Sequence, residues 1–235
     1  MHGNIHTGGL GATPVGTIDV PDVIPIFPLP KTVLLPGEVL PLHIFEPRYR
    51  SMVRDALESH RVIGIVEATP DTDTNDVGAA SVRSIGCVGF IAQHQELPDG
   101  RFLLWLLGLE RFRIDEELHL ATMYRQVRVS YTPAEESARD LAGIRPVRHE
   151  LRTLLPTLVD TDATTRDMLT AQMEEVSDTQ IIALACQILE LESRRKQQIL
   201  EAATQVDRFL MVYEDVYRHL DLNPGLDEID DSELN

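Results

Sequence analysis

Residues 24–49, IPIFPLPKTVLLPGEVLPLHIFEPRY, hold two apolar runs of β-strand character on either side of a proline-rich connection. The runs are Val23–Phe27 and Val39–Phe45. The residues that separate them and interrupt regular structure are Pro28, Pro30, Pro36 and Gly37. Proline fixes the φ angle and lacks a backbone donor, so we expect an irregular but ordered path between the two strands rather than a flexible linker.

A helix is expected directly after the second run. The residue before a proline avoids helical dihedral angles, which makes Glu46 a candidate N-cap and places Pro47 at the first helical position. A carboxylate there would also meet the positive end of the helix dipole. Apolar residues recur at helical spacing from Tyr49 to Leu57, so an amphipathic helix is predicted to about His60.

The chain from Arg61 to Thr132 has the pattern of β-strands. RVIGIVE, residues 61–67, is a short strand, and two long runs around the turn signal Pro98-Asp99-Gly100 make a hairpin. Residues 121–132 alternate again between apolar and polar. We count six or seven strands with one helix, which favours a small closed or half-closed barrel over a flat sheet.

Beyond Thr132 the hydrophobic period changes from two residues to about 3.6, which indicates helices. Ser177 and Gln180 form a predicted capping box, and Pro156 is expected to end a helix. The last helix carries an apolar stripe along nearly its whole length, so we expect it to pack against the others rather than in a dimer seam. The predicted helices cover about residues 138–154, 163–176, 178–192 and 194–220.

The expected fold class is therefore α+β, with a β-barrel lobe followed by an α-helical bundle lobe. The barrel lobe with its one helix is placed at residues 22–133 and the bundle lobe at 134–221. Residues 1–21 are rich in Gly, Thr and His without periodicity and are expected to be a disordered leader. Residues 222–235 are expected to be a loose acidic tail.

Composition and charge disfavour several classes of function. The chain of 235 residues has 21 Lys and Arg against 38 Asp and Glu, a formal net charge of −17. Binding to nucleic acid or to an anionic membrane surface is therefore not expected, because both need clustered basic residues. No signal peptide and no apolar run of membrane-spanning length is visible, so we expect a cytoplasmic location.

The sequence shows no metal-binding pattern. Cys87 and Cys186 lie in apolar contexts and are expected to be buried as small hydrophobes. The acidic loop at 68–77 lacks the Gly and Glu of a calcium loop, and the histidines are not spaced as ligands. We therefore expect no metal and no cofactor.

Four motifs in order resemble one known family. They are the opening stretch, VGFIAQHQELPDGRF at 88–102, GLERFRI at 108–114 and KQQILE at 196–201. Together they resemble the Lon substrate-binding domain, the N-terminal module of the ATP-dependent Lon proteases, which also occurs alone. The resemblance extends over roughly residues 23–220. It implies a PUA-like β-barrel followed by a helical bundle, which agrees with the independent count of strands and helices.

The two lysines test for the catalytic modules that accompany this domain in a full-length Lon protease. Lys31 follows a proline and Lys196 follows an arginine. A phosphate-binding loop needs Gly-Lys followed by Ser or Thr, so neither lysine belongs to one. Neither has surroundings typical of a Ser–Lys peptidase. We therefore expect a protein that is not an enzyme and has no catalytic residues.

The resemblance points instead to polypeptide binding. Three charged residues are candidates for orienting a bound chain, and three aromatic residues offer an apolar anchor. The candidates are Glu46, Arg48, Arg111, Phe45, Tyr49 and Trp105. Structural roles stay open for Glu46 as a helix cap, for Arg48 as a salt-bridge partner and for Trp105 as a core residue.

The function expected is that of a non-catalytic adaptor or regulator in protein quality control. Its partners would be polypeptide clients and a separate protease or chaperone. The alternatives are a hydrolase or a small-molecule-binding protein, and an RNA-binding barrel, which the net charge disfavours. We expect the ligand site in the cleft between the two lobes, since ligand clefts favour such interfaces. The oligomeric state is left open.

Overall fold

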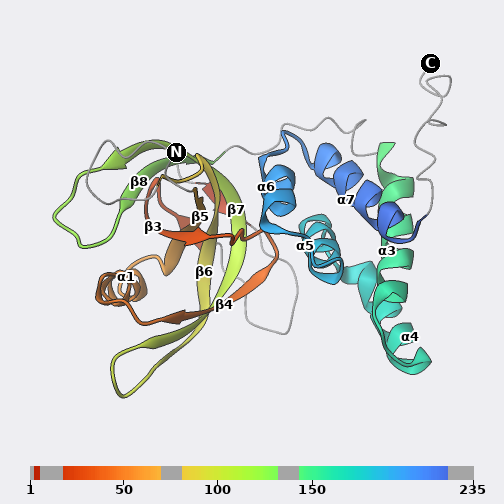
Figure 1. Ribbon diagram of the computed structural model, residues 1–235, viewed down its shortest axis with the longest axis horizontal. Helices are drawn as coiled ribbons and strands as arrows, with labels where there is room; N and C mark the ends of the chain where they lie inside the picture. Colours follow the sequence, from red (N-terminus) through yellow and green to blue (C-terminus); the bar gives the residue numbers. More distant parts are fainter. Residues whose placement is uncertain (1–2, 6–17, 70–80, 132–142, 222–235) are drawn as a thin grey trace.

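The computed structural model describes residues 3–5, 18–69, 81–131 and 143–221 (Figure 1). A lobe of strands with one helix lies on one side, and the remaining helices lie together on the other. This arrangement confirms the α+β fold class. The expected acidic tail, most of the leader and most of the acidic loop fall outside the described residues. So does the boundary expected at residue 133.

The strands of the first lobe close into a barrel. Six of the described strands form one sheet in the order β4-β7-β6-β5-β3-β8, and β8 also pairs with β7. The second half of β7, Phe112–Leu118, pairs with β8, whereas its first half, Phe102–Leu107, pairs with β4. The long β7 therefore closes the barrel and also extends beyond it. The strands are β3 (Val23–Pro30), β4 (Val39–Ile44), β5 (Val62–Ala68), β6 (Ile85–Glu96), β7 (Phe102–Leu118) and β8 (Gln126–Tyr131).

Strand β3 is longer than the sequence predicted, because it continues through Pro28 and Pro30. The amide of Ile26 donates to the carbonyl of Arg125, on the β8 side of the strand. Pro28 and Pro30 lie two and four residues after Ile26, so their backbone nitrogens face the same side of the strand. On that side β8 pairs only with Val23–Pro25. The missing amides therefore remove no ladder hydrogen bond, and β5 pairs with the other side.

Ordered structure also begins before residue 22, where the expected leader ended. A short strand, β2 (Ile18–Val20), pairs antiparallel with β1 (Gly3–Ile5). Val20 is buried in the barrel core beside Ile24 and Val127. Burial of this side chain explains why the chain is ordered ahead of β3.

The single helix of the barrel lobe is α1 (Pro47–Leu57). Glu46 occupies its N-cap position and Pro47 its first turn, as predicted, but the helix ends at Leu57 rather than near His60. Its buried face consists of Tyr49, Met52, Val53 and Ala56. This face covers the sheet, so the amphipathic pattern seen in the sequence is used for packing.

The bundle lobe contains more helices than the sequence predicted. The capping box at Ser177 is confirmed at the start of α5. Pro156 does not end α3 but lies inside its last turn, where it is buried and its missing amide costs the helix one hydrogen bond. The elements are α3 (Arg145–Leu158), α4 (Ala163–Gln172), the 3-10 turn η1 (Met173–Glu175), α5 (Asp178–Ile188), α6 (Ser193–Glu201) and α7 (Gln205–His219).

The long helix expected over residues 194–220 is in fact two helices, α6 and α7. Thr204 caps α7: its hydroxyl accepts from the amide of Asp207 at 3.0 Å, and the Asp207 carboxylate accepts from the amide of Thr204 at 3.1 Å. The apolar stripe continues across the break, which is why periodicity alone does not reveal it. The sequence signal is the capping pattern from Thr204 to Asp207.

Replacing Thr204 with alanine should therefore destabilise the bundle modestly. Loss of an N-cap side chain costs about 1 kcal/mol, and urea unfolding would measure it. Thr170→Ala is the matched control, because the Thr170 hydroxyl only donates to the carbonyl of Arg166 within α4. An equal effect of both substitutions would show that Thr204 does not act as a cap.

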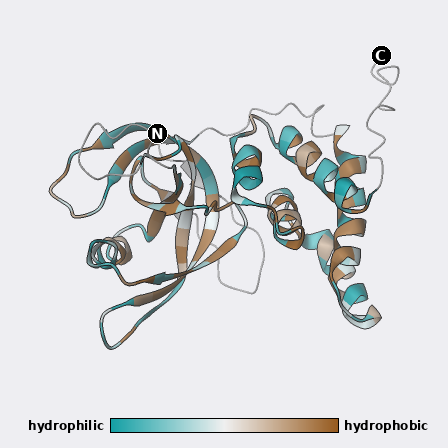
Figure 2. Cartoon of the chain, viewed as in Figure 1, coloured by the Kyte–Doolittle hydropathy of each residue, from teal (hydrophilic) through white to brown (hydrophobic). Residues whose placement is uncertain are grey.

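Two apolar cores hold the protein together. One fills the barrel around Phe112, and the other joins the opposite face of the sheet to α1, to the segment Val33–Leu35 and to the bundle. Figure 2 shows that α5 is mostly apolar in colour, whereas α6, which lies beside the barrel, is mostly polar. The two lobes therefore share a core, and α6 brings polar side chains to the place where they meet.

Candidate functional site

Three side-chain contacts join the two lobes at α6. Lys196 Nζ lies 2.6 Å from Glu38 Oε1, and both side chains are largely buried. Gln197 donates to the carbonyl of Ile85 at 3.1 Å. Arg111 donates to the carbonyl of Ala202 at 3.0 Å, at the end of α6.

These contacts assign a structural role to Arg111, one of the candidate binding residues. Burial lowers the pKa of its guanidinium, opposed by the neighbouring Glu110. Its donors point to backbone carbonyls at the C-terminal end of α6, where a cation is favourable. Along α6 the lobes meet through direct contacts, which differs from the cleft that the sequence led us to expect there.

Tyr49 is also a packing residue. It is buried, and its ring centroid lies 4.2 Å from that of Phe27. Burial raises the pKa of its hydroxyl. The aromatic area of Tyr49 therefore belongs to the core between α1 and β3 and is not available to a ligand.

Glu46 and Arg48 form an ion pair at the exposed start of α1. Arg48 Nη2 lies 2.9 Å from Glu46 Oε2, and both side chains are about half exposed. Glu46 holds the N-cap position by its backbone only, since its side chain makes no capping hydrogen bond. The Arg48 guanidinium also lies 4.6 Å from the centre of the Tyr49 ring. An exposed pair of this kind contributes little to stability.

Phe45 and Trp105 differ from the other candidates because both are exposed, Phe45 to 61% and Trp105 to 37%. They belong to one face of the sheet. Trp105 on β7 lies opposite Pro41 on β4, and the His43 ring, two residues before Phe45, lies 6.1 Å from the Phe45 ring. Because side chains alternate along a strand, the pairs Val39–Leu107 and His43–Leu103 lie on the same face as the pair Pro41–Trp105.

We call this face the β4–β7 surface. It consists of Val39, Pro41, His43, Leu103, Trp105 and Leu107 from the register of β4 and β7, together with Phe45, which directly follows β4. Val39 is 52% exposed, and Leu103 and Leu107 are half-buried. The opposite face of the same strands, with Ile44, Leu104 and Leu106, is buried in the core shared by the lobes. The sheet here is thus covered on one side by the described residues. On the other side Val39, Pro41, His43 and Trp105 are exposed, whereas Leu107 packs against the barrel core.

Among the described strands β4 is paired on one side only, and its other edge, called the free edge here, borders this surface. The amide of Gly108 donates to the carbonyl of Glu38. Every second residue from Glu38 along β4 therefore directs its backbone amide and carbonyl toward β7. Val39, Pro41 and His43 therefore direct their backbone groups to the free edge. Pro41 has no amide, so the middle of this edge cannot donate a hydrogen bond to an added strand.

Polar groups form the rim of the β4–β7 surface. Gln93 and Gln95 of β6 lie opposite Trp105 and Leu103. Near the turn, Arg101 pairs with Asp99 at 2.7 Å. The surface is therefore apolar at its centre and polar at its edge, which is the anatomy of a protein-binding patch.

Other chemistry is not assembled among the described residues. In the described ranges no three His, Cys, Asp or Glu side chains are grouped so that they could hold a metal ion. Cys87 and Cys186 are buried, as predicted, and burial raises the pKa of both thiols, that of Cys186 to about 12. Both are therefore protonated and unreactive at neutral pH. Within the described part of the chain, no helix combines the length and the apolar character of a membrane span.

Sequence comparisons place the chain among Lon-related proteins. A Lon protease of Anaeromyxobacter dehalogenans is 26% identical over 197 residues, which are 83% of this chain and 23% of that protein. Lon protease 2 of Myxococcus xanthus is 30% identical over 146 residues, 60% of this chain and 17% of that protein. The chain thus spans about a fifth of the length of these relatives.

Solved structures show the same fold. The N-terminal domain of the Mycobacterium avium complex Lon protease has a TM-score of 0.65 at 18% identity, covering 84% of this chain and 99% of that one. A Lon N-terminal domain protein from Xanthomonas campestris has a TM-score of 0.59 at 21% identity, covering 82% and 97%.

The family model of the ATP-dependent protease La (LON) substrate-binding domain matches residues 23–216. The match runs from β3 almost to the end of α7 and so includes both lobes. It corresponds to the substrate-binding part of those proteases and not to their catalytic part. This chain belongs to the LON substrate-binding domain family.

Proposed function

We propose that this chain binds polypeptide segments with exposed apolar side chains, and that the β4–β7 surface is where it binds them. The observation that carries the proposal is the exposure of Val39 and Trp105 on a single sheet face, with the exposed Phe45 directly after β4. Contiguous apolar area of this kind is unfavourable in water and is typical of interaction sites. Membership of a substrate-binding family supports polypeptide as the ligand.

The energetics of the surface favour an apolar anchor. Trp105 is flanked by Pro41 on β4 and by half-buried leucines on its own strand, so an incoming side chain would contact rigid groups on several sides. Tryptophan is over-represented among the residues that dominate binding energy. Burying apolar surface yields about 25 cal/mol per Å², so a few side chains suffice for reversible binding.

The edge of β4 determines how a segment would be held. A bound strand that extended the sheet would need an uninterrupted row of donors and acceptors, and Pro41 interrupts the row. Recognition by side chains on the open face remains, and it depends on apolar character more than on sequence. This mode suits clients that are recognised because they are unfolded.

We further propose that the protein acts without catalysis, as an adaptor or regulator in protein quality control in the cytoplasm. A separate protease or chaperone would process the clients that it binds. The family match to a binding part of Lon proteases supports this role. A hydrolase remains the alternative, and detectable turnover of a bound polypeptide by the purified protein would favour it.

Replacing Trp105 and Phe45 together with serine should weaken polypeptide binding by about a hundredfold, as expected when two aromatic anchors are lost. Fluorescence anisotropy with a labelled, permanently unfolded protein would measure the change. Neither side chain is in the buried core, so circular dichroism should show an unaltered fold.

Met168→Ser is the matched control for this experiment. Met168 is 61% exposed, as Phe45 is, but it lies on α4 in the bundle lobe. Binding by this variant should equal that of the wild type. If the Trp105/Phe45 variant also bound as the wild type does, the proposed surface would be wrong.

A further inference from the structure

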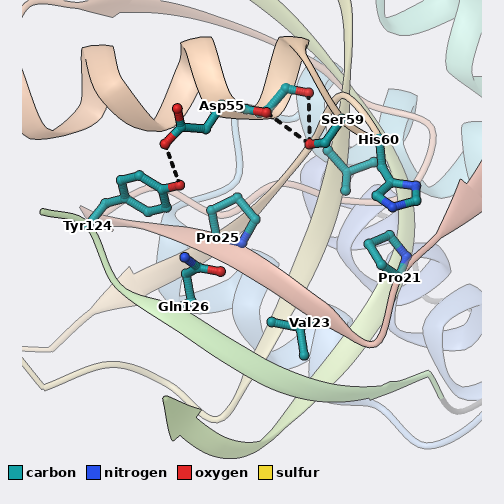
Figure 3. Close-up of a pocket in the computed structure, with 10 residues that line it drawn as sticks. Pro21, Val23, Pro25, Asp55, Ser59, His60, Tyr124 and Gln126 are labelled. Atoms are coloured by element: carbon teal, nitrogen blue, oxygen red, sulfur yellow. Dashed lines mark hydrogen bonds between the residues drawn. The ribbon is translucent and has the colours of Figure 1, made fainter. Parts of the chain in front are cut away.

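A pocket separate from the β4–β7 surface lies on the barrel lobe, between the end of α1 and the starts of β3 and β8. Its volume is about 120 Å³. Figure 3 shows Tyr124 and Asp55 side by side at one end of the pocket and His60 and Pro21 at the other. None of the β4–β7 surface residues lines it.

The polar end of this pocket is built around one carboxylate. The Tyr124 hydroxyl donates to Asp55 Oδ2 at 2.7 Å. Burial and the bond to Asp55 raise the pKa of Tyr124 to about 12, so the tyrosine keeps its proton at neutral pH. The Asp55 carboxylate is thereby held in one orientation, and its other oxygen is available as an acceptor.

The surroundings of Asp55 favour a positive charge. Asp55 lies in the last turn of α1, whose C-terminal end is the negative end of the helix dipole. Glu58 is the C-cap of the same helix. Arg125, the residue before β8, does not line the pocket, and two of its nitrogens donate to the Glu117 carboxylate at 2.7 Å.

The rest of the lining combines apolar walls with the polar side chains of Ser59, His60 and Gln126. Pro21, Val23 and Pro25 come from the chain entering and starting β3, and Val62 comes from β5. Rigid proline and valine side chains suit an aliphatic chain better than a bare ion. A carboxylate at one end of an apolar wall is the complement of a cation on an aliphatic stem.

We propose that this pocket binds the side chain of an arginine or lysine residue of a polypeptide. The cationic group would donate to the Asp55 carboxylate, and the aliphatic stem would pack on the prolines. The inference rests on the proposed function only in taking polypeptide as the ligand. Binding in this pocket would add selectivity among clients, which the apolar β4–β7 surface alone provides only weakly. Clients with a suitably placed basic residue would be held at two sites.

The test is a titration of isotope-labelled protein, followed by NMR, with N-acetyl-arginine methylamide. The amide signals of Ser59, Tyr124 and Gln126 should shift and saturate at millimolar concentration. The citrulline analogue has the same shape without the charge and should bind at least about fivefold more weakly, because it lacks the charge-assisted bond. The corresponding lysine derivative should shift the same signals.

Asp55→Asn should weaken arginine binding about tenfold, as loss of one partner of a charge pair does. Its amide oxygen can still accept from Tyr124, so the fold should be kept. Asp115→Asn is the control, because Asp115 is a carboxylate on β7 that likewise accepts from one hydroxyl, that of Ser130 at 3.1 Å. This variant should bind as the wild type does.

The inference is overturned by equal shifts with citrulline, by unchanged binding in Asp55→Asn, or by shifts that do not saturate. These outcomes are separate from failure of the proposed function, which is measured with a different probe at Trp105. Suppose that the Trp105/Phe45 variant alone loses binding to unfolded polypeptide and that arginine does not bind in this pocket. The inference about this pocket would then be wrong, and the proposed function would stand. If arginine binds in this pocket but polypeptide does not bind at Trp105, the proposal for the β4–β7 surface would be wrong and the inference about this pocket would stand.

Discussion

Replacing Gly108 with valine is expected to destabilise the protein by about 3 kcal/mol or more, as forced overpacking against backbone does. Gly108 lies in β7 beside the segment that precedes β4. A Cβ atom at this position would lie 2.1 Å from the carbonyl oxygen of Leu35, which is closer than any real contact. The amide and carbonyl of Gly108 also bond to Glu38 and Gly37, so the strand cannot move aside without losing both bonds.

Urea unfolding of Gly108→Val beside Gly143→Ala would measure this effect. A Cβ atom at Gly143 meets nothing within 4 Å, so this control should change stability by less than about 1 kcal/mol. An intermediate case is Gly89→Ala, where the nearest atom is the Leu34 side chain at 3.1 Å. Unchanged stability in Gly108→Val would show that the segment at Leu35 does not pack on β7 as described.

The second large effect is expected at the contact between the lobes. Lys196→Met should cost about 3 kcal/mol, because it leaves the Glu38 carboxylate largely buried without its cation. Glu38 also accepts from the amide of Leu35 at 3.0 Å, so its side chain cannot leave the interface freely. Thermal or urea unfolding would measure the loss.

A double variant separates the pair from its surroundings. Glu38→Gln combined with Lys196→Met should recover part of the stability lost in Lys196→Met, since no buried charge is left alone. Arg113→Met is the exposed control: Arg113 lies 3.5 Å from Asp115 with 63% of its side chain exposed. Its effect should be below about 1 kcal/mol. A similar small effect for Lys196→Met would show that the lobes do not depend on this pair.

Much of the fold follows from local patterns. The helix after Glu46, the hairpin at Pro98–Gly100 and the capping box at Ser177 were predictable because each depends on neighbouring residues. The course of β3 through Pro28 was not, because it depends on which side of the strand is left unpaired. The capping pattern at Thr204 indicated the break between α6 and α7. The apolar stripe continues across this break and led to the prediction of one long helix.

The candidate site was less predictable, for a physical reason. In a run such as Leu103–Leu107 every residue is apolar, so the sequence does not reveal which face of the strand is covered. In the structure Leu104 and Leu106 are buried, whereas Trp105 is 37% exposed. The role of Arg111 depends on Ala202, which is 91 residues away in the chain, and no local pattern links the two.

The central claim is that polypeptide binds at Trp105, and the intrinsic fluorescence of this residue tests it most directly. Trp105 is the single tryptophan of the chain, so the signal has one source. On titration with a permanently unfolded protein that lacks tryptophan, we expect a blue shift of its emission that saturates together with the anisotropy of the labelled ligand. Saturable binding by anisotropy without any change in Trp105 emission would contradict the claim.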